Sequence, residues 1–192
     1  MIRIISGGQT GVDRGALDAA LDAEVPCGGS CPKGFLAEDG QIPERYPLTE
    51  LDSEDYAERT LRNVLDADGT VLIYQEGPSG GTEYTLLECI QQKRPYLLLD
   101  ASEVEVGQAA RRIRQFVLEQ NIEVLNVAGP RASTDPNIYR AAVDIIEAVS
   151  FLNLSENNPM QTRAADGDAF PREIPRDIHG AVAEIISGMT LK

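Results

Sequence analysis

The chain has 192 residues, and its 17 basic and 31 acidic side chains give a formal net charge of −14. This acidic surplus repels the phosphate backbone of nucleic acids, so it excludes a broad basic face for binding them. Hydrophobic residues make up 42% and no apolar run is long enough to span a membrane, so we expect a soluble globular protein that binds no membrane.

The cysteines and the first residues of the chain indicate the cytoplasm. An odd number of cysteines, Cys27, Cys31 and Cys89, forms no disulfide framework and is typical of a reducing compartment. Arg3 and a glycine turn interrupt the apolar stretch that a signal peptide would need. Cys27 and Cys31 lack a second pair of ligands nearby, so we predict no intrinsic metal site.

Segments typical of strands alternate with segments of helical periodicity. A short buried strand is expected at residues 2–5. After a glycine-rich turn, a helix is expected at residues 12–23, with one apolar face formed by Ala16, Leu17, Ala20 and Leu21. The connector 24–51 is rich in glycine and proline. A connector of this length is usually functional, although it can also contain a short strand near Val25.

The second part of the pattern continues the alternation. Ser53 is expected to cap a helix that ends near Asp66, with an apolar face of Ala57, Leu61, Val64 and Leu65. Further strands are expected at residues 70–74, 95–99 and 123–127. Two further helices are expected, at residues 104–120 and after the cap Asp135-Pro136, the latter with the apolar face Ile138, Ala142, Ile145, Ile146 and Val149.

Strands that alternate with helices predict an α/β fold with a mainly parallel sheet and helices on both faces. The uniformly apolar runs 71–73 and 97–99 indicate strands buried on both faces. After Asn153 the composition becomes polar, which predicts a tail over residues 153–192. A short amphipathic helix is expected in this tail, packing either on the core or on a second subunit, with the stripe Ile178, Val182, Ile185, Ile186 and Met189.

Three loops with unusual composition leave the expected strands: Ser6–Gly11, Glu76–Thr82 and Ala128–Thr134. In an open parallel sheet, ligands bind beyond the carboxyl ends of the strands. The first two loops also precede helices, whose amino-terminal amides and dipole favour anions. We therefore predict that residues 7–10 and 80–82 form the two sides of a cradle for an anionic small molecule.

The predicted ligand-binding residues combine glycines, hydroxyl groups and a few cations. Arg131 is favoured among the cations because a guanidinium group suits an oxyanion or phosphate. Asp13 either contacts a ligand hydroxyl or a divalent ion, or caps its own helix. The predicted binding set is Ser6, Gly7, Gly8, Gln9, Thr10, Gly11, Asp13, Arg14, Lys33, Gly80, Gly81, Thr82 and Arg131.

Catalytic residues are harder to find than binding residues. The first glycine loop has neither the dinucleotide-binding spacing nor the lysine of a P-loop, and a tight turn without a ligand remains an alternative reading of it. The single histidine, His179, lies in the tail, so no Ser-His or Cys-His nucleophile pair can form in the core. We predict no catalytic residues, and the sequence favours a binding protein over an enzyme.

A collinear set of motifs runs through residues 1–152. It includes Ser6–Arg14, Cys31–Gly34, Ala37–Gly40, Tyr46–Leu48, Arg59-Thr60, Gly80–Thr82 and Leu125–Arg131. The set resembles the family of putative molybdenum carrier proteins, which is similar to the molybdenum cofactor carrier proteins of algae. That family belongs with the SLOG group of nucleotide-binding domains. The resemblance implies a Rossmann-like, doubly wound domain over residues 1–152, which forms a homo-oligomer and binds its ligand over the glycine loops.

For this family the implied ligand is the molybdenum cofactor, a phosphorylated pterin, or molybdate itself. The alternative is a sensor of nucleotide derivatives or an enzyme that processes nucleoside monophosphates. The SLOG phosphoribohydrolases use a glutamate three residues after their loop threonine, and here Thr85 takes that position while Glu83 and Glu88 lie at other offsets. Phe35 and Leu36 also replace basic residues of the family pattern, which weakens the expected grip of that loop on an anion.

Overall fold

The computed structural model describes residues 2–151. Within these residues a five-stranded sheet forms the centre of the fold, in the order β2 (Cys27–Gly28), β1 (Arg3–Ile5), β9 (Val124–Ala128), β7 (Gly69–Tyr74) and β8 (Tyr96–Asp100). Every neighbouring pair in this sheet is parallel. The predicted α/β fold with a mainly parallel sheet is confirmed, and β2 is the short strand expected near Val25.

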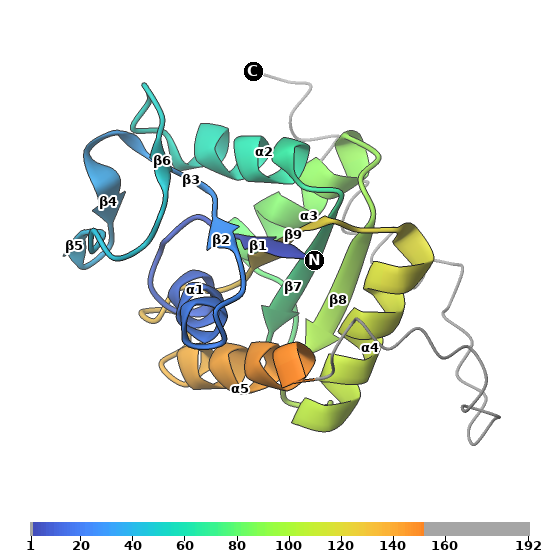
Figure 1. Cartoon of the computed structure of the whole chain (residues 1–192). Coiled ribbons are helices and arrows are strands. Elements are labelled where there is room, and N and C mark those ends of the chain that lie inside the picture. Colours follow the sequence, from blue (N-terminus) through green and yellow to red (C-terminus); the bar gives the residue numbers. More distant parts are fainter. Residues whose placement is uncertain (1, 152–192) are drawn as a thin grey trace, which may run out of the picture. The chain divides into compact units, whose positions relative to one another are not determined.

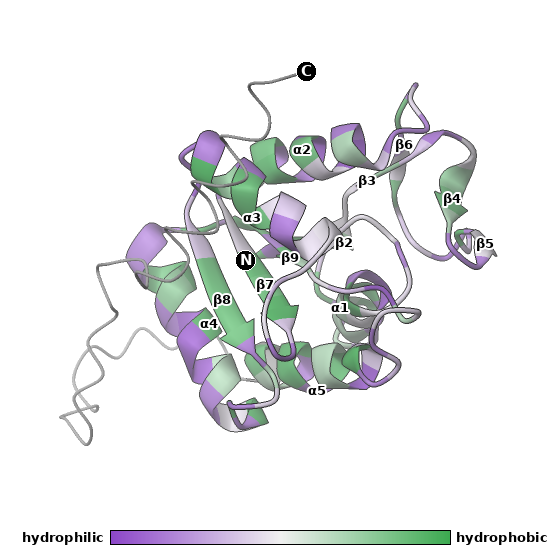
Figure 2. Cartoon of the chain, turned by 180° about the vertical axis from the view of Figure 1, so that it is seen from behind, coloured by the Kyte–Doolittle hydropathy of each residue, from purple (hydrophilic) through white to green (hydrophobic). Residues whose placement is uncertain are grey.

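Helices cover both faces of the sheet (Figure 1). On one face, α1 (Val12–Asp22), α4 (Val106–Gln120) and α5 (Ile138–Phe151) pack together, and on the other α2 (Tyr56–Asp66) packs against α3 (Gly81–Gln91). Side chains of β7 alternate between the two layers. Val71 and Ile73 join the core beneath α1, α4 and α5, while Leu72 and Tyr74 pack with Leu86 of α3. Figure 2 shows the resulting hydrophobic strands β7 and β8 between helices with polar outer faces.

The predicted apolar faces of α1 and α5 are buried except at the end of α1, whereas in α2 only Val64 of the predicted face is fully buried and Ala57 and Leu61 are partly buried. All five predicted apolar residues of α5 are buried. Leu21 and Leu65 are exposed to 36% and 40%, because each lies in the last turn of its helix, beyond the edge of the core. The predicted burial of residues 97–99 on both faces is also wrong at Leu98, which is only partly buried because β8 is an edge strand.

Helix α2 begins two residues later than its predicted cap implies. The side chain of Asp55, not Ser53, accepts a hydrogen bond from the Ala57 amide at 2.8 Å. The Ser53 hydroxyl instead accepts a bond from the Asp55 amide at 3.1 Å. Both residue types cap helices well, so spacing alone did not distinguish the cap from the turn before it.

The connector 24–51 is folded into small elements. β3 (Ser30–Cys31) pairs in parallel with β6 (Thr49–Glu50), a 3-10 turn η1 covers Lys33–Phe35, and β4 (Leu36–Ala37) pairs in antiparallel with β5 (Gly40–Gln41). We call residues 36–41 the β4–β5 hairpin. A small second core attaches the connector to α1 and consists of Leu17, Cys31, Ile42 and Tyr46.

The predicted tail, residues 153–192 with its apolar stripe, lies outside the described residues. Among residues 2–151, each helix is too short or too polar to cross a membrane.

Candidate functional site

A pocket of about 340 Å³ lies where the three predicted loops come together. Strands β1, β9 and β7 are neighbours in the sheet, so the loops that leave their carboxyl ends are neighbours too. Gln9 lines the pocket from the first loop, residues 79–82 from the second and residues 128–131 from the third. Helix α2 adds a further wall with Tyr56, Ala57, Arg59 and Thr60. The pocket thus lies beyond the strand ends, where open parallel sheets bind ligands.

The amino terminus of α3 opens onto this pocket without a side-chain cap. Gly80 is the cap residue, with a φ of 53° that favours glycine, and the first turn contributes Gly81 and Thr82 to the lining. Thr82 is 1% exposed, yet its hydroxyl has no hydrogen-bond partner among the described residues. An unpaired buried hydroxyl costs about 1–3 kcal/mol, so this group is suited to meet a ligand atom. The helix dipole adds a preference for negative charge.

Two other residues of the lining also hold a buried donor. These donors are Gln9 Nε2 and Arg59 Nε, and neither has a partner in the described part of the chain. The orientation of the Gln9 amide is fixed, because its Oε1 accepts bonds from the amides of Thr10 at 3.0 Å and Glu38 at 2.9 Å. Side-chain amide and guanidinium N–H groups only donate. Together with Thr82 they form a set of donors that is suited to a ligand rich in acceptor oxygens.

Two arginines bring positive charge to this side of an acidic molecule. The guanidinium carbons of Arg59 and Arg131 each lie 5.9 Å from the centre of the Tyr56 ring. Each arginine also has an acidic neighbour: Arg59 Nη1 lies 3.0 Å from Asp13 Oδ2, and Arg131 Nε lies 3.8 Å from Glu38 Oε2. Arg131 is 43% exposed at its side chain, which suits a position at the mouth of the pocket.

The first glycine loop is largely closed to an outside ligand. The Gln9 amide donates to Asp13 Oδ2 at 3.2 Å, and the Val12 amide at the start of α1 donates to the Pro130 carbonyl at 3.2 Å. The Ser6 hydroxyl donates to the Val127 carbonyl at 2.6 Å. Of the predicted binding residues in Ser6–Gly11, the structure therefore places only Gln9 in the pocket lining. The second side of the expected cradle is formed by α2 and the 128–131 segment.

The glycines of the first loop make room for protein side chains. A Cβ at Gly7 would lie 1.6 Å from Arg59 Nη1, and a Cβ at Gly8 would lie 2.4 Å from Leu48 Cδ1. The sequence predicted small residues here for the close approach of a ligand. In the structure, Arg59 and the connector occupy that space.

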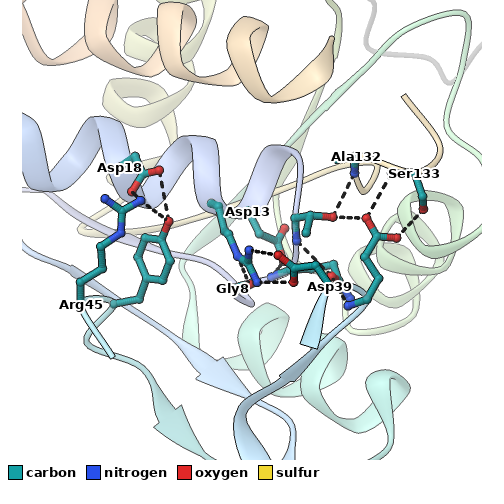
Figure 3. A network of polar contacts seen from close by, with 12 residues as sticks. Gly8, Asp13, Asp18, Asp39, Arg45, Ala132 and Ser133 are labelled. Atoms are coloured by element: carbon teal, nitrogen blue, oxygen red, sulfur yellow. Dashed lines mark hydrogen bonds and ion pairs between the residues drawn. The ribbon is translucent and has the colours of Figure 1, made fainter. Parts of the chain in front are cut away.

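Two of the remaining predicted residues, Arg14 and Thr10, hold the β4–β5 hairpin of the connector against the first loop, in the polar network of Figure 3. Arg14 donates to both carboxylate oxygens of Asp39, at 2.5 and 2.7 Å, and to the Gly8 carbonyl at 3.1 Å. Thr10 donates to Glu38 and accepts a bond from the Ala132 amide at 3.1 Å. Arg14 and Thr10 lie outside the pocket lining, as does the exposed Lys33.

Acidic side chains near the pocket differ in their protonation behaviour. Burial raises the pKa of Asp13, and the nearby Arg59 and the Gln9 amide offset only part of this effect. Burial also disfavours the charge of Glu38, but hydrogen bonds from Ser133 and Thr10 outweigh it and lower the pKa of Glu38. Hydrogen bonding from Arg14 lowers the pKa of Asp39.

Arg59 is the main lining residue that the binding set missed, together with Tyr56, Thr60, Ser79, Tyr84 and Thr85. The pair Arg59-Thr60 is among the motifs that carry the family resemblance, and this was the sequence feature that could have indicated Arg59 as a site residue. Neither Glu83 nor Glu88 lines the pocket, and the Thr85 hydroxyl donates to the Gly81 carbonyl at 2.9 Å. Across residues 2–151, no three side chains of His, Cys, Asp or Glu gather into a metal site.

The sheet order, the helices on both faces and the pocket beyond the strand ends define an α/β domain of the Rossmann-like class. Residues 4–150 match the model of the circularly permutated YpsA SLOG family, so the chain belongs to this family. The chain is also similar to the crystal structure of a putative molybdenum carrier protein from Syntrophus aciditrophicus SB. The TM-score is 0.76 with 46% sequence identity, over 78% of this chain and 94% of that one. These findings confirm the suspected family. Comparison with curated proteins gives no match.

Proposed function

We propose that this protein binds and carries an anionic small molecule in the pocket beyond β1, β9 and β7. The observation that carries the proposal is that three residues lining one pocket, Thr82, Gln9 and Arg59, each hold a buried donor without a partner in the described chain. The open amino terminus of α3 and the nearby Arg131 add positive potential. The similarity to a protein named as a molybdenum carrier supports a carrier role.

The size and lining of the pocket favour the molybdenum cofactor over molybdate alone. A volume of about 340 Å³ is within the range of sites for small organic ligands and exceeds the needs of one tetrahedral oxyanion. Tyr56 and Tyr84 add aromatic surface to the lining, which suits a heterocycle such as a pterin. The first turn of α3 with Gly81 and Thr82 is the part suited to hold the phosphate of such a ligand.

A nucleotide derivative is the second candidate, because it presents the same combination of phosphate and heterocycle. Hydrolysis of a nucleoside monophosphate is less well supported. Asp13 is the only carboxylate among the described lining residues, and it is buried in a pair with Arg59. We therefore infer binding without turnover, as sensor or carrier, for this class of ligand as well.

We further propose that the protein acts in the cytoplasm as a homo-oligomer, with the ligand-binding domain over residues 1–152 and the remainder as a tail. Its resemblance to the carrier family supports this organisation. Native mass spectrometry of the full chain, purified gently from its host, reports the number of subunits and the mass of any retained small molecule. Detection of the monomer alone would contradict the proposed oligomer.

Thermal unfolding with added ligands tests the binding proposal. Molybdate, a phosphorylated pterin and AMP are added separately at millimolar concentration to the full chain. A bound ligand at 100 times its Kd stabilises the native state by about 2.7 kcal/mol, so the pterin phosphate or AMP is expected to raise the Tm clearly. Replacing the mouth cation in Arg131→Gln should reduce the shift, whereas Arg111→Gln on the exposed face of α4 should not.

Two results would contradict this proposal. Unchanged Tm values with all three compounds, together with no retained small molecule by native mass spectrometry, would remove the carrier role. Release of free base from AMP by the wild-type chain would instead establish the enzymatic alternative.

A further inference from the structure

We propose that Asp13 competes with the bound anion for Arg59 and thereby sets the affinity of the pocket. This inference rests on the proposed function. It assigns Arg59 as the direct ligand of the anion, and it assigns Asp13 as a positioning residue that weakens the interaction. The pair would make uptake reversible, as a carrier requires.

The first step is that Asp13 occupies a position suited to an anion. Its Oδ2 accepts a hydrogen bond from the Gln9 amide at 3.2 Å and lies 3.0 Å from Arg59 Nη1. The amide belongs to the glycine loop that precedes α1, and such loops are ready-made anion sites. The carboxylate of Asp13 therefore fills, from within the protein, the place that the sequence suggested for a ligand oxyanion.

The second step is that Arg59 has bonding capacity beyond this pair. Its Nη1 is used by Asp13, while its Nε is buried without a partner in the described chain. The side chains of Arg59 and Asp13 are only 14% and 5% exposed, and both residues line the pocket. A guanidinium group has five N–H donors and can serve two acceptors at once. An anion in the pocket would share Arg59 with Asp13.

The third step is that the first loop is built around this ion pair. A Cβ at Gly7 would lie 2.5 Å from Arg59 Cζ and 2.8 Å from Asp13 Oδ2. Glycine at this position therefore allows the carboxylate and the guanidinium group to meet above the loop. The absence of a side chain at Gly7, the first glycine of the family motif, is therefore accounted for by the Asp13–Arg59 ion pair without a ligand.

The electrostatic consequence follows from the burial of both groups. Charges in a region shielded from water interact much more strongly than exposed charges. The negative charge of Asp13 repels an incoming anion and offsets part of the attraction of Arg59. Removing that charge while keeping the acceptor oxygen should leave Arg59 with one anionic partner, the ligand.

The test compares Asp13→Asn with the wild type by calorimetric titration of the full chain with molybdate and AMP as probes. The asparagine Oδ1 can still accept the Gln9 amide. We expect the affinity of Asp13→Asn for at least one probe to rise about tenfold or more, the effect typical of a close charge pair. Arg59→Gln should bind more weakly, and adding Asp13→Asn to Arg59→Gln should give no gain.

Asp39→Asn is the matched control, because Asp39 forms an ion pair with Arg14 outside the pocket lining. Its affinity should equal that of the wild type. If Asp13→Asn does not fold, the NMR resonance of the Arg59 Nε–H group in the wild-type chain reports whether the probe contacts Arg59. It should shift on addition of the probe, and an unchanged resonance in a chain that binds would overturn the inference.

The outcomes separate this inference from the proposed function. Binding to the wild type, with equal or weaker binding to Asp13→Asn, overturns the competition and leaves the binding function intact. Binding of neither molybdate, AMP nor a phosphorylated pterin to either chain, with no small molecule retained in native mass spectrometry, overturns the proposed function. Binding only to Asp13→Asn supports the competition in its strongest form.

Discussion

The hydroxyl of Thr82 connects the stability of the protein to its binding function. Thr82 is fully buried at the start of α3, and its Oγ1 finds no acceptor or donor in the described chain. A buried polar group without a partner destabilises the folded state, while the same group is available to a ligand oxygen. Natural proteins accept such costs at functional sites.

Replacing Thr82 by valine should separate these two effects. Valine has nearly the same shape but no hydroxyl, so we expect the Tm of the ligand-free Thr82→Val variant to be equal to or above that of the wild type. Its affinity for an anionic probe should fall about tenfold or more, because a hydrogen bond to a charged group contributes about 1.5–3 kcal/mol. Calorimetric titration and thermal unfolding measure the two quantities.

The exposed Thr49 of β6 provides the matched control. Thr49→Val should leave the affinity unchanged. A clear loss of stability in Thr82→Val would show that its hydroxyl has a partner in the folded protein, and unchanged affinity would remove it from the ligand site.

At the scale of residues, the sequence was informative where a side chain follows a strand directly. Gln9, the segment 80–82 and Arg131 were predicted for the site and line the pocket, because parallel strands bring their carboxyl ends to one edge. Arg59 was missed because it lies in the middle of a helix. Helical periodicity predicts which face is buried, but it does not predict that a cation outside the predicted apolar face reaches over a distant glycine loop.

At the scale of elements, the β4–β5 hairpin depends on side-chain contacts with other loops. Its strands have two residues each and are largely exposed, so the pairing within the hairpin is too small to be stable alone. Glu38 accepts hydrogen bonds from Thr10 and from the amide and hydroxyl of Ser133, and Asp39 pairs with Arg14. These contacts attach the hairpin to the loops after β1 and β9.

Acid should weaken this attachment. The pKa of Glu38 lies below its ordinary value of 4.5 in the folded protein, against the effect of burial, because Ser133 and Thr10 donate to its carboxylate. A lowered pKa means that the charged form stabilises the fold above pH 4.5, and that this contribution disappears as the pH falls through the lower, folded-state value. Glu38→Gln should lower the free energy of unfolding by about 1 kcal/mol at pH 7, since the contacts are at the surface.

The difference in unfolding free energy between the wild type and Glu38→Gln should therefore shrink at pH values below about 4. Denaturant unfolding at several pH values measures it. Glu44→Gln, at an exposed position in the same connector, is the control and should change the free energy of unfolding little. A Glu38→Gln difference that stays constant down to pH 3 would contradict the role of its charge.

The larger elements were predictable and the connector was not, for a physical reason. Strands such as Gly69–Tyr74 and helices such as Ile138–Phe151 carry enough residues for a hydrophobic period to be visible. The strands of the connector have two residues each, which is too short for any period, and β3 pairs with β6 at the other end of the connector. The cap of α2 was misplaced for the related reason that Ser53 and Asp55 are both good capping residues.

At the scale of the whole molecule, the net charge of −14 opposes the arrival of an anionic ligand. The arginines nearest to the pocket do not remove this effect, since Arg59 and Arg131 each lie beside a carboxylate. Recognition therefore depends on short-range hydrogen bonds and on the start of α3, while the approach of the ligand is governed by long-range repulsion. The association and dissociation rate constants should then respond differently to salt, and the affinity should follow the association rate constant.

Salt should accelerate the association of an anionic ligand with this protein. The Debye length falls from about 30 Å at 0.01 M to about 8 Å at 0.15 M ionic strength, so the repulsion by distant carboxylates is screened while contacts inside the pocket are much less affected. Stopped-flow measurements with AMP should show an association rate constant that rises a few-fold over this range, with little change in the dissociation rate constant. Arg131→Gln should show a steeper rise, because it removes a local attraction, whereas Arg111→Gln on α4 should behave as the wild type. A rate constant that falls with salt would mean that the positive potential of the pocket reaches further than the charge of the rest of the molecule.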